Sequence, residues 1–353
     1  MLHFDDLAVG PAPQLPLDAF QRRRERLADQ LDGTLVVATN PELTYSNDVE
    51  HRFRPHSDFW YLTGFAEPGA VLALDETGRT TLFCRPRDAK AEVWTGRRLG
   101  VERAADALGV DRVHSIDELG DVLPKILGKQ TYQITEHDPD VAETLANHAP
   151  DSDPGNDLVA EMRLRKDAAE IDMLRRACDV GAAAMREALP LAKPGAREYE
   201  VEAALLRHYR AAGSTGPGYP AIVGAGANAA VLHYIENRDA IQSGDLVLVD
   251  AGCEWGYYNS DITRTVPADG HFSDAHADLY GLVHAAQQAA MAKVAPGNRL
   301  QDVHEAAAAV LTEGFVERGW LSEASTEGMR RFYMHGTSHF LGLDVHDVGR
   351  YKL

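Results

Sequence analysis

The residues best suited to chemistry in this sequence are two aspartates followed by a cluster of histidines. Asp250 closes an apolar β-type run at 246–249, and Asp261 lies just before a second such run. Glycine and asparagine between the runs supply turn material, so we expect the aspartates on neighbouring strands of one hairpin, facing one pocket. Two carboxylates held that close repel each other unless a cation offsets their charge, and hard oxygen ligands suit divalent manganese, cobalt or zinc.

Three histidines follow within twelve positions, at His335, His339 and His346. Gly-Thr-Ser at 336–338 makes a helix a poor guess, so the first two do not form the helical histidine pair of zinc proteases. A neutral imidazole can bind metal while neighbouring histidines donate hydrogen bonds or carry a proton. Taken singly, each aspartate is better explained as a solvated strand end or turn residue, and each histidine, His233 included, as a satisfied core or surface residue. The residues alone leave both explanations open.

The composition limits the class of protein and its partners. The chain has 353 residues, of which 44% are hydrophobic, enough for a large core and about two domains. Its 35 lysines and arginines against 54 aspartates and glutamates give a net charge of -19, which disfavours nucleic acid or an anionic membrane as partner. Cys84, Cys178 and Cys253 stand singly, and no leader or membrane-spanning run is found. We expect a cytoplasmic protein.

A seam rich in proline, glycine and acids at 149–157 predicts a domain boundary, dividing the chain into 1–155 and 156–353. Before the seam, β-rich runs alternate with helical segments, which indicates a mixed α/β domain. After it, Asp167 and Glu170 are spaced as a capping box at the start of a long helix. The predicted helices are 17–31, 167–189, 198–212, 274–294 and 302–319, and the predicted strands are 33–38, 70–74, 80–84, 221–224, 233–234, 246–250 and 262–266.

Segments in both parts of the chain resemble one known group of enzymes. The order and spacing of motifs at 222–228, 232–237, 246–254, 261–267 and 335–349 are similar to those of the pita-bread metallopeptidases, which include methionine aminopeptidase, prolidase, creatinase and aminopeptidase P. Residues 53–65 and 92–100 resemble the N-terminal domain of bacterial aminopeptidase P. The resemblance implies an α/β (α+β) chain, with an N-terminal mixed-sheet domain of the creatinase-N type followed by a pita-bread catalytic domain.

The resemblance also implies a ligand set and a reaction. Asp250 matches a bidentate-type ligand of one metal, Asp261 a bridging ligand and His339 the single imidazole ligand of a site for two divalent ions, with Mn²⁺ expected. In such a site a metal-bridging hydroxide attacks the scissile carbonyl, because the metals lower the pKa of water and polarise the carbonyl. The expected substrates are peptides with proline in second position, from which the N-terminal residue is released.

Four further residues receive roles from the same resemblance. His233 and His346 match catalytic histidines that contact substrate or intermediate, and His335 matches one that lines the same pocket. Trp94 matches a residue near the substrate entrance in oligomeric relatives, so we expect a substrate-binding role for it and a homo-oligomer.

The sequence departs from the family pattern at its C-terminal side. That pattern contains two further glutamates downstream, one in a Val-Glu-Pro-Gly type turn, and the sequence stops at Leu353 before either. We therefore expect a C-terminally truncated chain that binds the second metal poorly, since two carboxylates offset only half the charge of two divalent ions. Hydrolysis is expected to be weak or absent. Two alternatives stay open: a prolidase acting on Xaa-Pro dipeptides, or a non-catalytic pita-bread protein that binds a peptide or protein.

Overall fold

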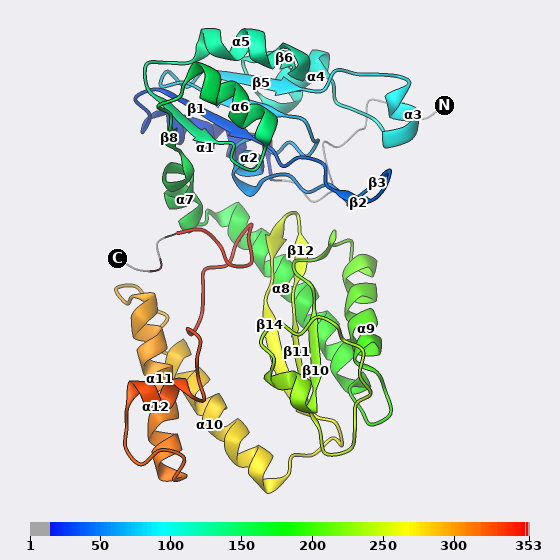
Figure 1. Cartoon of the computed structure of the whole chain (residues 1–353), viewed down its shortest axis with the longest axis vertical. Coiled ribbons are helices and arrows are strands. Elements are labelled where there is room, and N and C mark those ends of the chain that lie inside the picture. The colour runs from blue at the N-terminus through cyan, green and yellow to red at the C-terminus, as the bar shows by residue number, and fades with distance from the viewer. Residues whose placement is uncertain (1–14, 350, 352–353) are drawn as a thin grey trace. The chain divides into compact units, whose positions relative to one another are not determined.

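The computed structural model describes residues 15–349 and residue 351, and the chain divides into two compact units (Figure 1). The first unit holds the described residues up to Arg175 together with Trp255–Tyr258, and the second holds Arg176–Glu254 and the described residues from Asn259 onward. No helix in this part of the chain is both long and apolar enough to cross a membrane. The domain boundary expected after residue 155 stays a prediction, because packing contacts do not show which segment folds by itself.

A six-stranded sheet lies at the centre of the first unit. The strand order is β6-β5-β4-β1-β7-β8, with antiparallel β1–β4 and β4–β5 pairs and parallel β5–β6, β1–β7 and β7–β8 pairs. This mixed sheet confirms the predicted architecture. The strands are β1 (Thr34–Ala38), β4 (Val71–Leu74), β5 (Thr80–Cys84), β6 (Arg112–Ser115), β7 (Thr131–Ile134) and β8 (Asp153–Pro154).

Helices cover this sheet because its central strands are apolar. Every residue of β1, β4 and β5 is buried, as is typical of a sheet covered on both faces. On one face, Val36, Val71 and Phe83 form a core cluster with the buried residues of α5 (Leu119–Ile126) and α6 (Pro139–His148). The remaining elements are α1 (Leu17–Ala28), α2 (Ser57–Thr63), α3 (Ala91–Thr95), α4 (Val101–Leu108), α7 (Asn156–Leu164) and the β2 (Thr44–Ser46) and β3 (Val49–Glu50) pair.

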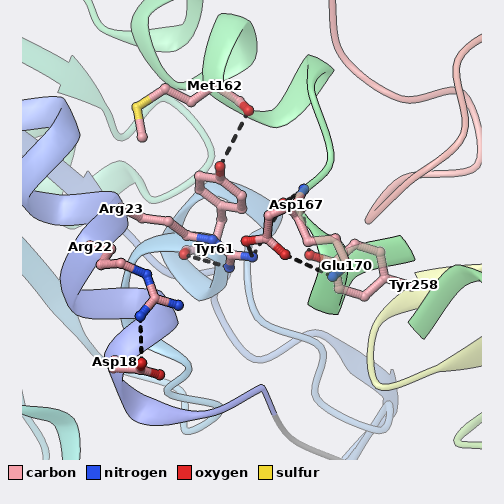
Figure 2. A network of polar contacts seen from close by, with 8 residues as sticks. All are labelled: Asp18, Arg22, Arg23, Tyr61, Met162, Asp167, Glu170 and Tyr258. Atoms are coloured by element: carbon pink, nitrogen blue, oxygen red, sulfur yellow. Dashed lines mark hydrogen bonds and ion pairs between the residues drawn. The ribbon is translucent and has the colours of Figure 1, made fainter. Parts of the chain in front are cut away.

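A buried arginine on α1 anchors the start of the long helix that follows Asp167 (Figure 2). Arg23 donates to the carbonyl oxygen of Tyr61 at 3.1 Å, and its guanidinium lies 3.4 Å from the Glu170 carboxylate. The predicted capping box is present, since the backbone N–H groups of Asp167 and Glu170 each donate to the other's carboxylate, at 3.0 and 2.9 Å. Tyr258 also donates to Glu170, at 2.8 Å. This network fixes the first turn of the helix.

The second unit is built around two small sheets. The first has the order β10-β11-β14, all antiparallel, and the second has the order β13-β12-β9. α9 packs against β10. The long helix is α8 (Ala168–Ala188), and the helix after it is α9 (Glu198–Ala211). The strands of the two sheets are β9 (Gly216–Pro217), β10 (Ile222–Ala225), β11 (Leu246–Ala251), β12 (Cys253–Trp255), β13 (Tyr258–Asn259) and β14 (Ile262–Pro267).

The two strands expected to carry the aspartates are neighbours, but the chain between them is more than a turn. β11 and β14 pair directly, with Asp250 opposite Thr263, while the intervening residues form β12 and β13. Gly252 makes this detour sterically possible. A Cβ at this position would lie 1.7 Å from the main-chain oxygen of Ser260, so only glycine allows the two backbone segments to lie so close.

A helical pair completes the second unit. α10 (Asp274–Met291) packs along α11 (Leu300–Glu317), and both contribute to a core cluster with Met329 of α12 (Thr326–Arg330). Both long helices lie where the sequence predicted them: α10 begins at the predicted residue and ends three residues earlier, and α11 begins and ends two residues earlier than predicted. Ser273 caps α10 by accepting a hydrogen bond from the backbone N–H of His276.

The strand predicted at 233–234 is wrong, because residues 231–239 form neither helix nor strand. The physical reason lies in Asn237, a buried residue in the left-handed conformation with φ 46°. Its side chain accepts from the backbone N–H of Val223 at 2.9 Å and donates to the carbonyl of Ala221 at 2.8 Å. A side chain therefore provides the hydrogen bonds that a neighbouring strand would supply, and the segment carrying His233 needs no regular structure.

Candidate metal centre

Most of the predicted site residues line one cavity in the second unit. The cavity has a volume of about 1260 Å³ and is bounded by α8, by β11 and β14, and by the irregular segment after α12. This volume suits a peptide rather than a single ion or small metabolite. The predicted residues on its wall are His233, Asp250, Asp261, His335, His339 and His346.

The two carboxylates meet through a third side chain that the sequence reasoning missed. The hydroxyl of Tyr219 lies 2.5 Å from Oδ1 of Asp250 and 2.9 Å from Oδ1 of Asp261. Because a phenol has one proton, it can donate to only one of them at a time, and the two carboxylates share that donor. No spacing rule points to Tyr219. The only signal is its place in Gly-Tyr-Pro, directly before the strand that pairs with the one carrying Asp250.

The electrostatics of the pair are unequal. Burial raises the pKa of Asp250 above its ordinary value, and the nearby charge of Asp261 adds to this effect. Burial alone would also raise the pKa of Asp261, but hydrogen bonds from His339 and Tyr219 outweigh it and lower the pKa of that carboxyl. For Tyr219, burial and both carboxylates raise the pKa far above the ordinary range. Tyr219 therefore stays protonated, and Asp261 is the group that stays ionised.

His339 faces the carboxylates with its Nε2 atom. That nitrogen lies 3.0 Å from Oδ2 of Asp261, while Nδ1 lies 2.8 Å from the carbonyl oxygen of Phe340. A carbonyl only accepts, so Nδ1 carries a proton; without a cation Nε2 donates a second proton to the Asp261 carboxylate, and a bound cation would take the place of that proton. The hydrogen bond to Asp261 raises the pKa of His339. An imidazole oriented this way is the usual arrangement of a metal-binding histidine.

His346 joins this group, whereas His233 and His335 stand apart on the cavity wall. The rings of His339 and His346 are 4.3 Å apart, and the donor atoms of Asp261, His339 and His346 all lie within 4.8 Å of one another. The Nδ1 atom of His335 lies 2.9 Å from the carbonyl oxygen of Gly336. The substrate and catalytic roles predicted for the three histidines outside the ligand set stay predictions.

Trp94 lies in the first unit, on the short helix α3. It is 88% exposed, so its indole has little contact with its own chain. Its predicted place near a substrate entrance stays a prediction.

The donor set fits a divalent cation. Two partly buried carboxylates face each other with one hydroxyl proton between them, and an imidazole nitrogen of His339 points at Asp261. Oxygen ligands with a single nitrogen suit manganese, cobalt, zinc or iron. Asp250, Asp261 and His339 are the residues that would hold the ion, with His346 beside them.

Comparisons with known proteins agree with this geometry. The family model of metallopeptidase family M24 matches residues 172–352, and the family model of the aminopeptidase P N-terminal domain matches residues 20–135. The chain is 40% identical to the Xaa-Pro aminopeptidase of Haemophilus influenzae, covering 96% of this chain and 82% of that protein, and 38% identical to the Escherichia coli Xaa-Pro aminopeptidase, covering 94% and 81%.

Solved structures give the same result. Pseudomonas aeruginosa aminopeptidase PepP matches with a TM-score of 0.91 and 38% identity, covering 96% of this chain and 83% of that one. Zinc-substituted Escherichia coli aminopeptidase P in complex with product matches with a TM-score of 0.89 and 36% identity, over 96% and 83%. Identity of this level over nearly the whole chain, together with a cluster of side chains that could hold a metal ion, shows that the protein belongs to metallopeptidase family M24, as a metalloexopeptidase of the aminopeptidase P type.

Proposed function

We propose that this protein releases the N-terminal residue from peptides with proline in second position, using divalent metal held by Asp250, Asp261 and His339. The observation that carries the proposal is the convergence of these three side chains, with the Tyr219 hydroxyl between the carboxylates, in a cavity large enough for a peptide. Relatives named Xaa-Pro aminopeptidase, up to 40% identical over 96% of the chain, support the choice of substrate.

The protein's own residues provide orientation and proton handling. When bound, the divalent cation supplies Lewis acidity and a water of lowered pKa close to the scissile carbonyl. The Phe340 carbonyl holds the His339 ring through Nδ1, which leaves Nε2, the nitrogen that faces Asp261, as the one that would bind the ion. His346 stands beside His339, where an imidazole N–H can donate to an oxyanion that develops on the substrate. His233 and His335, on the cavity wall, are available to hold the peptide.

We propose further that the first cation binds more tightly than the second. The carboxylates described on the cavity wall are Asp250 and Asp261, whose combined charge of about -2 matches one divalent ion rather than two. The protein therefore works slowly at limiting metal. Manganese is the proposed ion, although the Escherichia coli relative was also solved with zinc in place. The proposal includes a homo-oligomer in which the exposed Trp94 contacts the substrate entrance.

Hydrolysis of three substrates tests this function. An Xaa-Pro-Xaa tripeptide, an Xaa-Ala-Xaa tripeptide and an Xaa-Pro dipeptide would be incubated with the protein, with added Mn²⁺ or with a chelator. We expect slow, Mn²⁺-dependent release of the first residue from the Xaa-Pro tripeptide only. Asp278→Asn, which removes an exposed carboxylate paired with Arg318 on the helical pair, is the control that should leave the rate unchanged. Preference for the dipeptide would indicate a prolidase, and tight peptide binding without hydrolysis a binding protein.

A further inference from the structure

The two histidines beside the carboxylates lie on a segment without regular secondary structure. Residues 334–349 contain neither helix nor strand, so no ladder of backbone hydrogen bonds fixes His339 and His346. Metal ligands must be held to within about 0.5 Å, which an irregular segment reaches only through bonds to its surroundings. We call residues 335–347 the ligand loop.

One buried side chain joins this ligand loop to the strand that precedes Asp261. Asn259, at the end of β13, is only 2% exposed. Its side-chain Nδ2 donates to the carbonyl oxygen of Leu343 at 2.8 Å and approaches that of Gly342 at 3.4 Å, while its backbone N–H donates to the Gly342 carbonyl at 2.9 Å. Two adjacent peptide groups of the ligand loop are thus held by one residue.

The position of Asn259 in the chain gives these bonds a consequence for the site. Asn259 lies two residues before Asp261, and the intervening Ser260 is fully buried and accepts from the backbone N–H of Cys253 at 3.0 Å. The backbone that carries Asp261 and the carbonyls that Asn259 holds are therefore joined through a short, fixed path. On the other side of that path, His339 Nε2 reaches Asp261 at 3.0 Å.

The neighbouring glycine leaves the space that this side chain needs. A Cβ at Gly218 would lie 2.3 Å from the Oδ1 atom of Asn259, closer than any real Cβ contact. Gly218 itself donates its N–H to the carbonyl of Gly252, so its backbone is not free to move away. A glycine at 218 and an asparagine at 259 are thus sterically matched.

We propose that Asn259 is a positioning residue for the metal centre: by binding the carbonyls of Gly342 and Leu343, it sets the distance between the ligand loop and Asp261. The proposal rests on the assignment of Asp261 and His339 as metal ligands, but the position of the ligand loop can be measured without metal. Its physical content is that the donor N–H groups of the amide matter, not the volume of the side chain.

Three variants separate an effect of the amide N–H donors from an effect of side-chain volume. Asn259→Asp keeps the shape but replaces the donor with a carboxylate that repels two carbonyls, and Asn259→Ala removes both shape and donor. Ser214→Ala is the matched control, because the Ser214 hydroxyl is also buried and also bonds two carbonyls, those of Glu254 and Gly216, away from the ligand loop. Hydrogen exchange in the metal-free protein and titration with Co²⁺ would be measured for all three.

We expect both Asn259 variants to speed amide exchange within 340–347 at least about 10-fold, and to weaken Co²⁺ binding by about 10- to 100-fold with a changed visible Co²⁺ spectrum, the range found for residues that orient metal ligands. Ser214→Ala should neither speed exchange within 340–347 nor weaken Co²⁺ binding, even if it lowers the free energy of unfolding as much as the Asn259 variants do. A wild-type-like Asn259→Asp, or exchange that rises equally throughout the unit, would overturn the proposal. If the unchanged protein binds no Co²⁺, the proposed function fails, while the exchange data still decide the role of Asn259.

Discussion

The carboxylate and imidazole ligands of the candidate metal centre are held in two different ways. Asp250 lies within β11 and Asp261 directly before β14, and six residue pairs from Leu246–Pro267 to Ala251–Ile262 join these strands. The ligand loop has no such ladder and depends on individual bonds, such as those from Asn259 and the 3.0 Å contact between His304 Nδ1 and the Thr337 hydroxyl. A strand position is specified by its neighbours in sequence, whereas a loop position is specified by side chains from elsewhere.

Removing the charge of Asp261, directly before β14, should have the largest effect. Asp261 contacts both Tyr219 and His339, and it is the carboxyl of lowered pKa. We expect Asp261→Asn to weaken Mn²⁺ binding by more than about 100-fold, because losing a ligand costs more than losing a residue that orients one. The strand pair should survive, so calorimetric titration of a folded variant is the measurement. Asp278→Asn is again the control, and near-normal affinity in Asp261→Asn would remove Asp261 from the ligand set.

Removing the hydroxyl between the carboxylates should come next. We expect Tyr219→Phe to lower the free energy of unfolding of the metal-free protein by about 1.5–3 kcal/mol, since a hydrogen bond to a charged group is lost and the two carboxylates then face each other unscreened. Added divalent metal should restore most of this loss. Urea unfolding with chelator or with Mn²⁺ measures both.

A second tyrosine provides the control for that experiment. Among the described residues, the buried hydroxyl of Tyr209 on α9 has no hydrogen-bond partner. Tyr209→Phe should therefore leave stability unchanged or slightly raised, with or without metal. Equal losses in the two variants would show that the hydroxyl of Tyr219 has no special relation to the carboxylates.

A carboxylate of the first unit, Asp111, shows what backbone hydrogen bonds do alone. Asp111 accepts from the N–H and the hydroxyl of Thr80, both at 2.7 Å, and the backbone hydrogen bond is the main reason that the pKa of Asp111 is lowered. A lowered folded-state pKa stabilises the fold above the unfolded-state pKa, and this stabilisation is lost as the pH falls through the folded-state value.

The stability difference between the unchanged protein and Asp111→Asn should therefore be constant at neutral pH and shrink once the pH falls below about 4. Urea midpoints across this range provide the measurement. A difference that grows toward acid would contradict the assigned direction of the shift.

The smallest effect is expected within the ligand loop itself. Ser338, next to His339, has a φ of 65°, a left-handed conformation that costs a residue with a Cβ about 1 kcal/mol. Ser338→Gly relieves this cost but adds freedom to the unfolded chain. We therefore expect the free energy of unfolding, measured by thermal unfolding, to change by less than about 1 kcal/mol. Asn47→Gly, at φ 49° in the turn between β2 and β3, should change less still, because asparagine tolerates this conformation. A large loss at Ser338 would mean that its hydroxyl supports the ligand loop.

The same contrast explains what could be predicted from the sequence. The strands next to Asp250 and Asp261 were predictable because runs of apolar and β-branched residues, separated by glycines, define them locally. Tyr219 was not, because its hydroxyl reaches the carboxylates only after β10 has paired with β11. The strand expected at His233 was wrong for a similar reason, since the bonds that replace it come from the single side chain of Asn237. Asn259 reaches the ligand loop across 83 residues of sequence, a distance at which no local pattern applies.

The close approach at Gly252 has a consequence for how this sequence can change over time. A main-chain oxygen fills the place where any side chain would begin, so even alanine is excluded by atoms that no compensating substitution can remove. At other positions one side-chain replacement can be compensated by a second one nearby, but at position 252 no residue other than glycine fits. We therefore expect glycine at position 252 in related genes because two stretches of backbone touch there, and not because the residue takes part in the reaction.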